Sequence, residues 1–161
     1  MDRAGMIRVS VWQRSKQSAT TLLQAAATPE RVLRLSLGIV YLWFGALKVA
    51  GTSPVIDLIR HSYPFLATPA PFMGLGLFEV ALAVALISGV LKPWVAAATV
   101  CHMIGTFGVF VFSPQVAFAP HFPCLTMTGE FVAKNVVLIS VALVLWRESV
   151  APAPAGARDQ E

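Results

Sequence analysis

Residues 72–91 read FMGLGLFEVALAVALISGVL, an apolar stretch in which Glu79 is the only charged side chain. A helix of this length rises about 30 Å at ~1.5 Å per residue, which matches the hydrocarbon thickness of a bilayer. Lys92 and Pro93 follow directly, and a second apolar stretch occupies residues 94–112. Because so few residues separate the two stretches, we expect a tight antiparallel hairpin of membrane-spanning helices.

Two more stretches of the same kind occupy residues 32–50 and 129–146. The whole chain of 161 residues is 57% hydrophobic and 12% charged, and its mean hydropathy is +0.71, which excludes an ordinary soluble domain. The predicted fold class is therefore all-α, a polytopic membrane protein built as an antiparallel bundle of four transmembrane helices. One domain is expected at 32–147, between a basic N-terminal tail at 1–31 and a disordered C-terminal tail at 148–161.

The basic residues beside the spans predict the orientation, because Lys and Arg accumulate on the cytoplasmic side. Basic side chains are frequent in both tails and in the hairpin at Lys92, whereas the opposite side offers only Arg60. Both termini are therefore predicted to be cytoplasmic, in the inner (plasma) membrane of a bacterium, with the N-terminal tail retained rather than cleaved. The net charge of +4 is attributed to topology and lipid, and no nucleic-acid motif accompanies it.

Ionisable side chains within the spans mark the candidate site, because a charge in hydrocarbon costs several kcal/mol unless it faces protein, water or a partner charge. Counting residues at ~1.5 Å each puts Lys48, Glu79 and Lys134 at similar depths, roughly 5–10 Å below the outer boundary. Together with Glu130 they predict one near-neutral layer, in which Glu79 pairs with either lysine and Glu130 pairs with Lys134 at i, i+4 spacing. His102 is expected deeper, apart from this layer.

Helical spacing predicts which faces of three helices point inward. Small residues recur on these faces, and small residues let helices approach closely in lipid. The expected faces are Gly38, Tyr41, Gly45 and Lys48 on the first helix, Gly76, Glu79 and Ala83 on the second, and Ala98, His102, Gly105 and Val109 on the third.

The resulting polar seam consists of Tyr41, Lys48, Glu79, His102, Glu130 and Lys134. It is consistent both with a structural lock that fixes helix register and with a binding or proton-handling role, for which Glu79 and His102 are the catalytic candidates. No metal site is predicted, because no histidines have ligand spacing on a helix. Cys101 lies in a span and Cys124 in a loop, too far apart in depth for a disulfide, so an ordinary free cysteine is the expectation for Cys124.

Three segments together resemble the DoxX-like family of small four-helix membrane proteins. RLSLGIVYLWFGALKV at 34–49 is similar to the family's first helix, LGLFEVALAVALISG at 75–89 to its Glu-bearing second helix, and LTMTGEFVAKNVVLISVALVL at 125–145 to its fourth. The resemblance covers residues 32–147. It implies a four-helix fold with Lys48, Glu79 and Lys134 as the polar layer, whereas His102 departs from relatives that usually have another polar residue such as Gln there.

Members of this family are associated with thiosulfate:quinone oxidoreduction, with thiol-redox complexes or with membrane-protein assembly, and many have no assigned role. The function expected from the resemblance is an accessory or anchoring component of a membrane redox system for quinones, thiols or sulfur, not an autonomous enzyme. The alternatives are a catalytic quinone-linked oxidoreductase subunit and a small permease or channel. The expected partners are the lipid bilayer, a membrane redox protein and a second copy of the chain, with no intrinsic cofactor and a quinone as the candidate ligand.

Overall fold

The computed structural model describes residues 28–90 and 92–151. The chain divides into two compact units, residues 1–33 and 34–161, and each is described by itself. In the first unit, the Thr28 hydroxyl accepts a hydrogen bond from the Arg31 amide at 3.4 Å, and the Thr28 carbonyl accepts one from the Val32 amide at 3.1 Å. These contacts begin the first described helix. The tails predicted at 1–31 and 148–161 lie largely outside the described residues.

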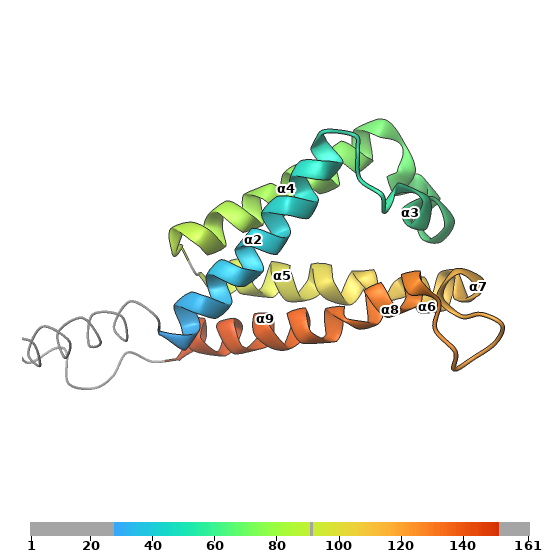
Figure 1. The fold of residues 1–161 in the computed structure, drawn as a ribbon. Helices are drawn as coiled ribbons and strands as arrows, with labels where there is room; N and C mark the ends of the chain where they lie inside the picture. Colours follow the sequence, from blue (N-terminus) through green and yellow to red (C-terminus); the bar gives the residue numbers. More distant parts are fainter. Residues whose placement is uncertain (1–27, 91, 152–161) are drawn as a thin grey trace, which may run out of the picture. The chain divides into compact units, whose positions relative to one another are not determined.

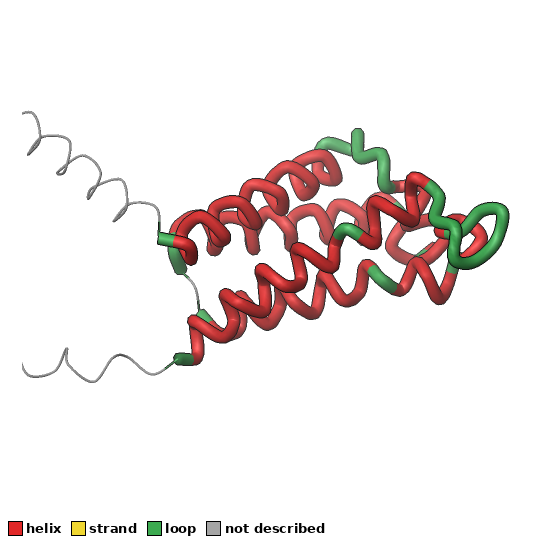
Figure 2. Tube along the Cα trace, turned by 60° about the horizontal axis from the view of Figure 1, so that its bottom comes forward, coloured by secondary structure: helices red, strands yellow, loops and turns green. Residues whose placement is uncertain are grey.

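The described segments are helices and connecting loops (Figure 2). Four helical stretches are long and apolar enough to cross a membrane, Pro29–Val49, Pro69–Ser88, Pro93–Phe112 and Met127–Val150, which confirms the predicted all-α membrane bundle. In chain order the helices are α2 (Pro29–Val49), α3 (Ile56–Ser62), the 3₁₀ helix η1 (Pro64–Ala67), α4 (Pro69–Ser88), α5 (Pro93–Thr106), α6 (Gly108–Phe112), α7 (Pro114–Ala117), α8 (Met127–Ala133) and α9 (Asn135–Val150).

Local sequence explains several helix ends. Helices α4 and α5 begin at Pro69 and Pro93, where the missing backbone N–H has no intrahelical partner to lose. Helix α4 ends at Ser88, and the next residue, Gly89, caps it with a left-handed φ of 85° that a side chain would disfavour. The Thr126 hydroxyl caps α8 by accepting from the Gly129 amide at 3.0 Å.

Within the second unit, α5 packs along α9, and α4 also contacts α5 (Figure 1). The short helix α3 packs against η1 and α6, while α7 contacts both α6 and α8. Large apolar side chains point outward from the spans, such as Trp43 at 68% exposure and Val111 at 74%. Such a surface suits lipid, in which outward apolar groups cost nothing.

Two of the spans are interrupted for one residue (Figure 2). Phe107 separates α5 from α6, and Lys134 separates α8 from α9. Near both points backbone amides bond three residues back instead of four, as in Phe107 N–H to Ile104 O and Val137 N–H to Lys134 O, each 3.0 Å. The spans predicted at 94–112 and 129–146 were expected to be continuous helices, and nothing in the residue types at 107 or 134 forbids a helix.

Candidate functional site

A close crossing of α2 and α4 carries the site. A Cβ built on Gly76 would lie 2.9 Å from the Gly45 carbonyl oxygen, and a Cβ on Gly45 would lie 2.9 Å from the Gly76 carbonyl oxygen. The two backbones therefore touch at a point where neither could carry a side chain without moving. Lys48 and Glu79 each follow their glycine by three residues, so they project from the same face of their helices, just beside the crossing.

Lys48 and Glu79 form a buried ion pair. Lys48 Nζ lies 2.6 Å from Glu79 Oε2, and each side chain is only 6% exposed. A buried charge is costly unless it is paired and hydrogen-bonded, and this charge-assisted bond meets that requirement. The Lys48 ammonium also lies 5.9 Å from the centroid of the Phe44 ring, a further favourable contact for a cation.

His102 extends the ion pair to a third helix. Its Nε2 lies 3.1 Å from the second carboxylate oxygen, Glu79 Oε1, and its Nδ1 lies 3.0 Å from the Tyr41 hydroxyl. The Tyr41 hydroxyl also lies 3.3 Å from the Thr99 carbonyl oxygen. We call Lys48, Glu79, His102 and Tyr41 the buried polar cluster.

The buried polar cluster has hydrogen bonds for two protonation states. In the first, Tyr41 donates to Nδ1 of a neutral imidazole, Nε2–H donates to Glu79, and the cluster is neutral overall. In the second, Tyr41 turns its hydroxyl proton to the Thr99 carbonyl, and a doubly protonated His102 donates to both Tyr41 and Glu79. The two states differ by one proton and one hydroxyl rotation, and the contacts of His102 with Tyr41 and Glu79 are made in both.

A cavity of about 320 Å³ borders the cluster. Its walls are mostly aliphatic and aromatic side chains from α2, α3, η1, α4, α5, α6, α8 and α9, including Phe44 and Phe131, whose rings meet edge to face with centroids 5.7 Å apart. An apolar hollow with a few converging polar groups is the usual form of a small-molecule site. The polar side chains that line it are Tyr41, Lys48, Tyr63, Glu79, His102, Thr106 and Asn135.

Lys48 keeps hydrogen-bonding capacity on the cavity side. An ammonium carries three N–H donors, and the described residues provide one acceptor for them, Glu79 Oε2. The remaining donors belong to a buried side chain that lines the cavity. The site can therefore donate to an acceptor oxygen of a bound molecule.

The family model for DoxX matches residues 31–114. The chain belongs to the DoxX family. The matched range contains all four members of the buried polar cluster and ends two residues after α6. Neither a curated protein nor a solved structure matches the chain significantly.

In this DoxX-family protein the residues of the predicted polar seam lie in two separate groups. Glu130 and Lys134 pair with each other at 3.9 Å, as the i, i+4 spacing predicts, but their side chains are 59% and 77% exposed. They do not join Lys48 and Glu79 in one layer, so that grouping was wrong. Residue counting gives only the position along the helix, whereas rotation about the helix axis decides the face, and the buried face of α8 carries Gly129 and Val132 instead.

The expected isolation of His102 was also wrong, because the imidazole contacts Glu79 directly. A long side chain such as that of Glu79 can reach a residue on another helix that lies at a different position along the bundle. The inward faces predicted for the first two helices are buried as expected. On the third helix the buried residues are Val95, Ala96, Thr99, Met103 and Val109, whereas Gly105 is exposed.

Sequence reasoning missed three polar residues at the cavity, Tyr63, Thr106 and Asn135. A signal for one of them was present, because Thr99, His102 and Thr106 follow one another at spacings of three and four and so share a face of the third span. Tyr63 lies outside the spans, and burial raises the pKa of its phenol above the ordinary value. That hydroxyl donates to the Gly105 carbonyl at 2.6 Å.

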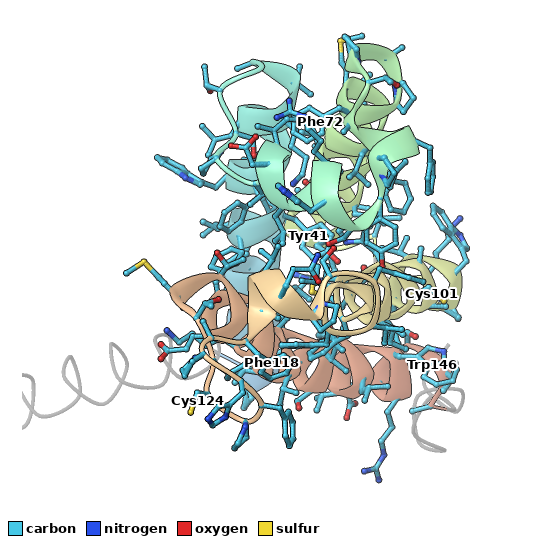
Figure 3. All side chains as sticks on the ribbon, turned by 90° about the vertical axis from the view of Figure 1, so that its right-hand side faces the viewer. Tyr41, Phe72, Cys101, Phe118, Cys124 and Trp146 are labelled. Atoms are coloured by element: carbon cyan, nitrogen blue, oxygen red, sulfur yellow. The ribbon has the colours of Figure 1, made fainter. Side chains whose placement is uncertain are left out.

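The two cysteines are free thiols and both are exposed. Figure 3 shows Tyr41 near the middle of the view, whereas Cys124 lies at the edge, on the loop before α8. Within residues 28–90 and 92–151 there is no group of three His, Cys, Asp or Glu side chains that could hold a metal ion.

Proposed function

We propose that this DoxX-family protein is an accessory component of a membrane redox system and that its cavity binds a quinone. The observation that supports this proposal is the apolar cavity of about 320 Å³ with the buried polar cluster in its wall. A quinone combines an apolar ring and tail with carbonyl oxygens, so it needs both features of this cavity.

The residues of the cluster have distinct roles in this proposal. Lys48 donates a hydrogen bond to a carbonyl oxygen of the ligand, because its spare donors lie at the cavity. Glu79 holds the ammonium in place, and His102 bonds the second carboxylate oxygen of Glu79 and so fixes its orientation from α5. A partner protein supplies the electrons, and co-purification from native membranes would identify it.

The proposed location is the plasma membrane, with both termini in the cytoplasm. The support is the distribution of charge, since Lys92 lies in the hairpin between α4 and α5 while Arg60 is the only Lys or Arg between α2 and α4. In this orientation the loop that contains Cys124 faces outward.

Ligand titration of the full chain in nanodiscs tests the quinone proposal. Duroquinone is the probe, isothermal titration calorimetry the measurement, and nanodiscs without protein the blank. Glu79→Gln is expected to weaken binding at least tenfold, because a charge of the cluster is lost. Glu130→Gln is the matched control, since it makes the same chemical change at an exposed pair, and it is expected to leave binding within twofold.

Two outcomes contradict the proposal: no binding above the blank by the unchanged protein, or equal effects of Glu79→Gln and Glu130→Gln. Tyr41→Phe keeps the test decisive if Glu79→Gln does not accumulate. That change removes only the hydroxyl that bonds His102, and a several-fold loss of binding is expected.

The contact of His102 with both Glu79 and Tyr41 favours a second candidate, a catalytic subunit that transfers protons to the quinone. Quinone reduction by the complex purified from native membranes separates the two. In the catalytic case His102→Gln abolishes turnover while the complex still assembles and binds duroquinone. In the accessory case turnover continues at a rate within a few-fold of the unchanged complex.

A further inference from the structure

The two helix interruptions meet at a second polar site on the cavity. The Asn135 amide nitrogen lies 3.0 Å from the Thr106 hydroxyl oxygen, so it joins α9 to α5. Thr106 comes directly before the interruption at Phe107, and Asn135 comes directly after the one at Lys134. Irregular backbone at membrane depth is tolerated where it is buried in protein or lines a cavity, and interrupted helices are typical of binding sites in membrane proteins.

The hydrogen bonds determine the orientation of the Asn135 amide. The Thr106 hydroxyl donates its proton to the Met103 carbonyl at 2.6 Å, so its oxygen can only accept from Asn135. Asn135 must therefore direct its NH₂ group at Thr106. The amide then keeps one N–H donor and the Oδ1 acceptor, and neither has a partner among the described residues.

These free groups belong to a side chain that lines the cavity. Asn135 and Thr106 both line it, and no Asn135 atom is among the enclosed side-chain N and O atoms without a hydrogen-bond partner, which in the described residues belong to Arg34, Ser53, Ser62 and Ser113. Because Thr106 follows His102 by four residues on α5, the two side chains lie on one face, about 5–6 Å apart at Cβ.

We propose that Asn135 is the second oxygen-binding group of the cavity and makes it selective for ring compounds with oxygens at opposite ends, namely para-quinones and their quinols. This inference rests on the proposed quinone binding. One oxygen of the ring bonds to the buried polar cluster and the other bonds to Asn135. The free N–H of Asn135 suits the carbonyl of a quinone, and its Oδ1 suits the hydroxyl of a quinol, so both redox forms are held.

A pair of ligands that differ in one oxygen tests this selectivity. Duroquinol has two ring oxygens, and 2,3,5,6-tetramethylphenol has the same ring and methyl groups with one. Calorimetry on the full chain in nanodiscs is expected to show duroquinol binding about tenfold more tightly, the effect of one hydrogen bond. Asn135→Leu is expected to remove that preference while tetramethylphenol binding stays within twofold.

Thr106→Val provides a second variant if Asn135→Leu does not fold. It removes the oxygen that orients the amide, so a partial loss of the preference for duroquinol is expected, and Thr106→Ser is expected to restore it. Equal binding of the two ligands by the unchanged protein, or equal weakening of both by Asn135→Leu, overturns the role of Asn135 alone. Binding of neither ligand overturns the proposed quinone function as well.

Discussion

Replacing Glu79 by Gln is expected to destabilise the bundle strongly. The change keeps the shape of the side chain but leaves the Lys48 ammonium, 6% exposed, without a counter-charge. Breaking a buried ion pair by removing one partner costs about 3–5 kcal/mol, because an uncompensated charge remains. Replacing both partners, as in Lys48→Met with Glu79→Leu, removes both charges and should recover most of that loss.

Equilibrium unfolding in bicelles, followed by steric trapping, measures these free energies. Glu130→Gln is the matched control, because its carboxylate belongs to an exposed pair at 3.9 Å and should contribute at most about 1 kcal/mol. If Glu79→Gln costs no more than Glu130→Gln, the Lys48–Glu79 pair carries no buried charge and the reasoning fails. If the double variant is as unstable as the single one, the uncompensated ammonium is not the cause.

Three further changes have definite expectations. Gly76→Ala should lower the free energy of unfolding by about 1–3 kcal/mol, because its Cβ would meet the Gly45 carbonyl oxygen at 2.9 Å. The control Gly74→Ala meets nothing within 4 Å and should change that free energy by no more than about 0.5 kcal/mol. Equal unfolding free energies of the two variants would refute the close crossing. Gly108→Ala should lower stability by a similar amount, since its Cβ would overlap the Tyr63 hydroxyl. A Tyr63→Phe background should relieve only part of that cost, because the ring carbon that carries the hydroxyl would still lie 2.8 Å from the Cβ. A membrane-impermeant maleimide should label Cys124 in intact cells, and labelling only after the cells are opened would reverse the proposed orientation.

The sequence predicts the spans well because length and apolar composition alone decide whether a helix can cross a bilayer. It also predicts the buried faces of α2 and α4, where glycines and polar residues recur at helical spacing. The interruption at Lys134 could not be predicted, since Lys favours a helix. The exposure of Glu130 and Lys134 could not be predicted either, because it depends on how the helix rotates against its neighbours.

The Glu79 carboxylate is shared by three helices, since Lys48 comes from α2 and His102 from α5. A structural lock needs only that each bond be made, whereas proton handling needs a group that titrates. His102→Gln separates the two, because a Gln amide can donate to Glu79 and accept from Tyr41 without changing charge.

We expect His102→Gln to change the free energy of unfolding by less than about 1.5 kcal/mol, the contribution of one hydrogen bond. We also expect it to abolish quinone reduction by the complex purified from native membranes if the imidazole passes a proton to the ligand, because an amide cannot act as a general acid or base there. Turnover within a few-fold of the unchanged complex would leave His102 with a structural role. A large loss of stability together with unchanged turnover would support the same conclusion, because the imidazole would then be a packing group that links α5 to the ion pair.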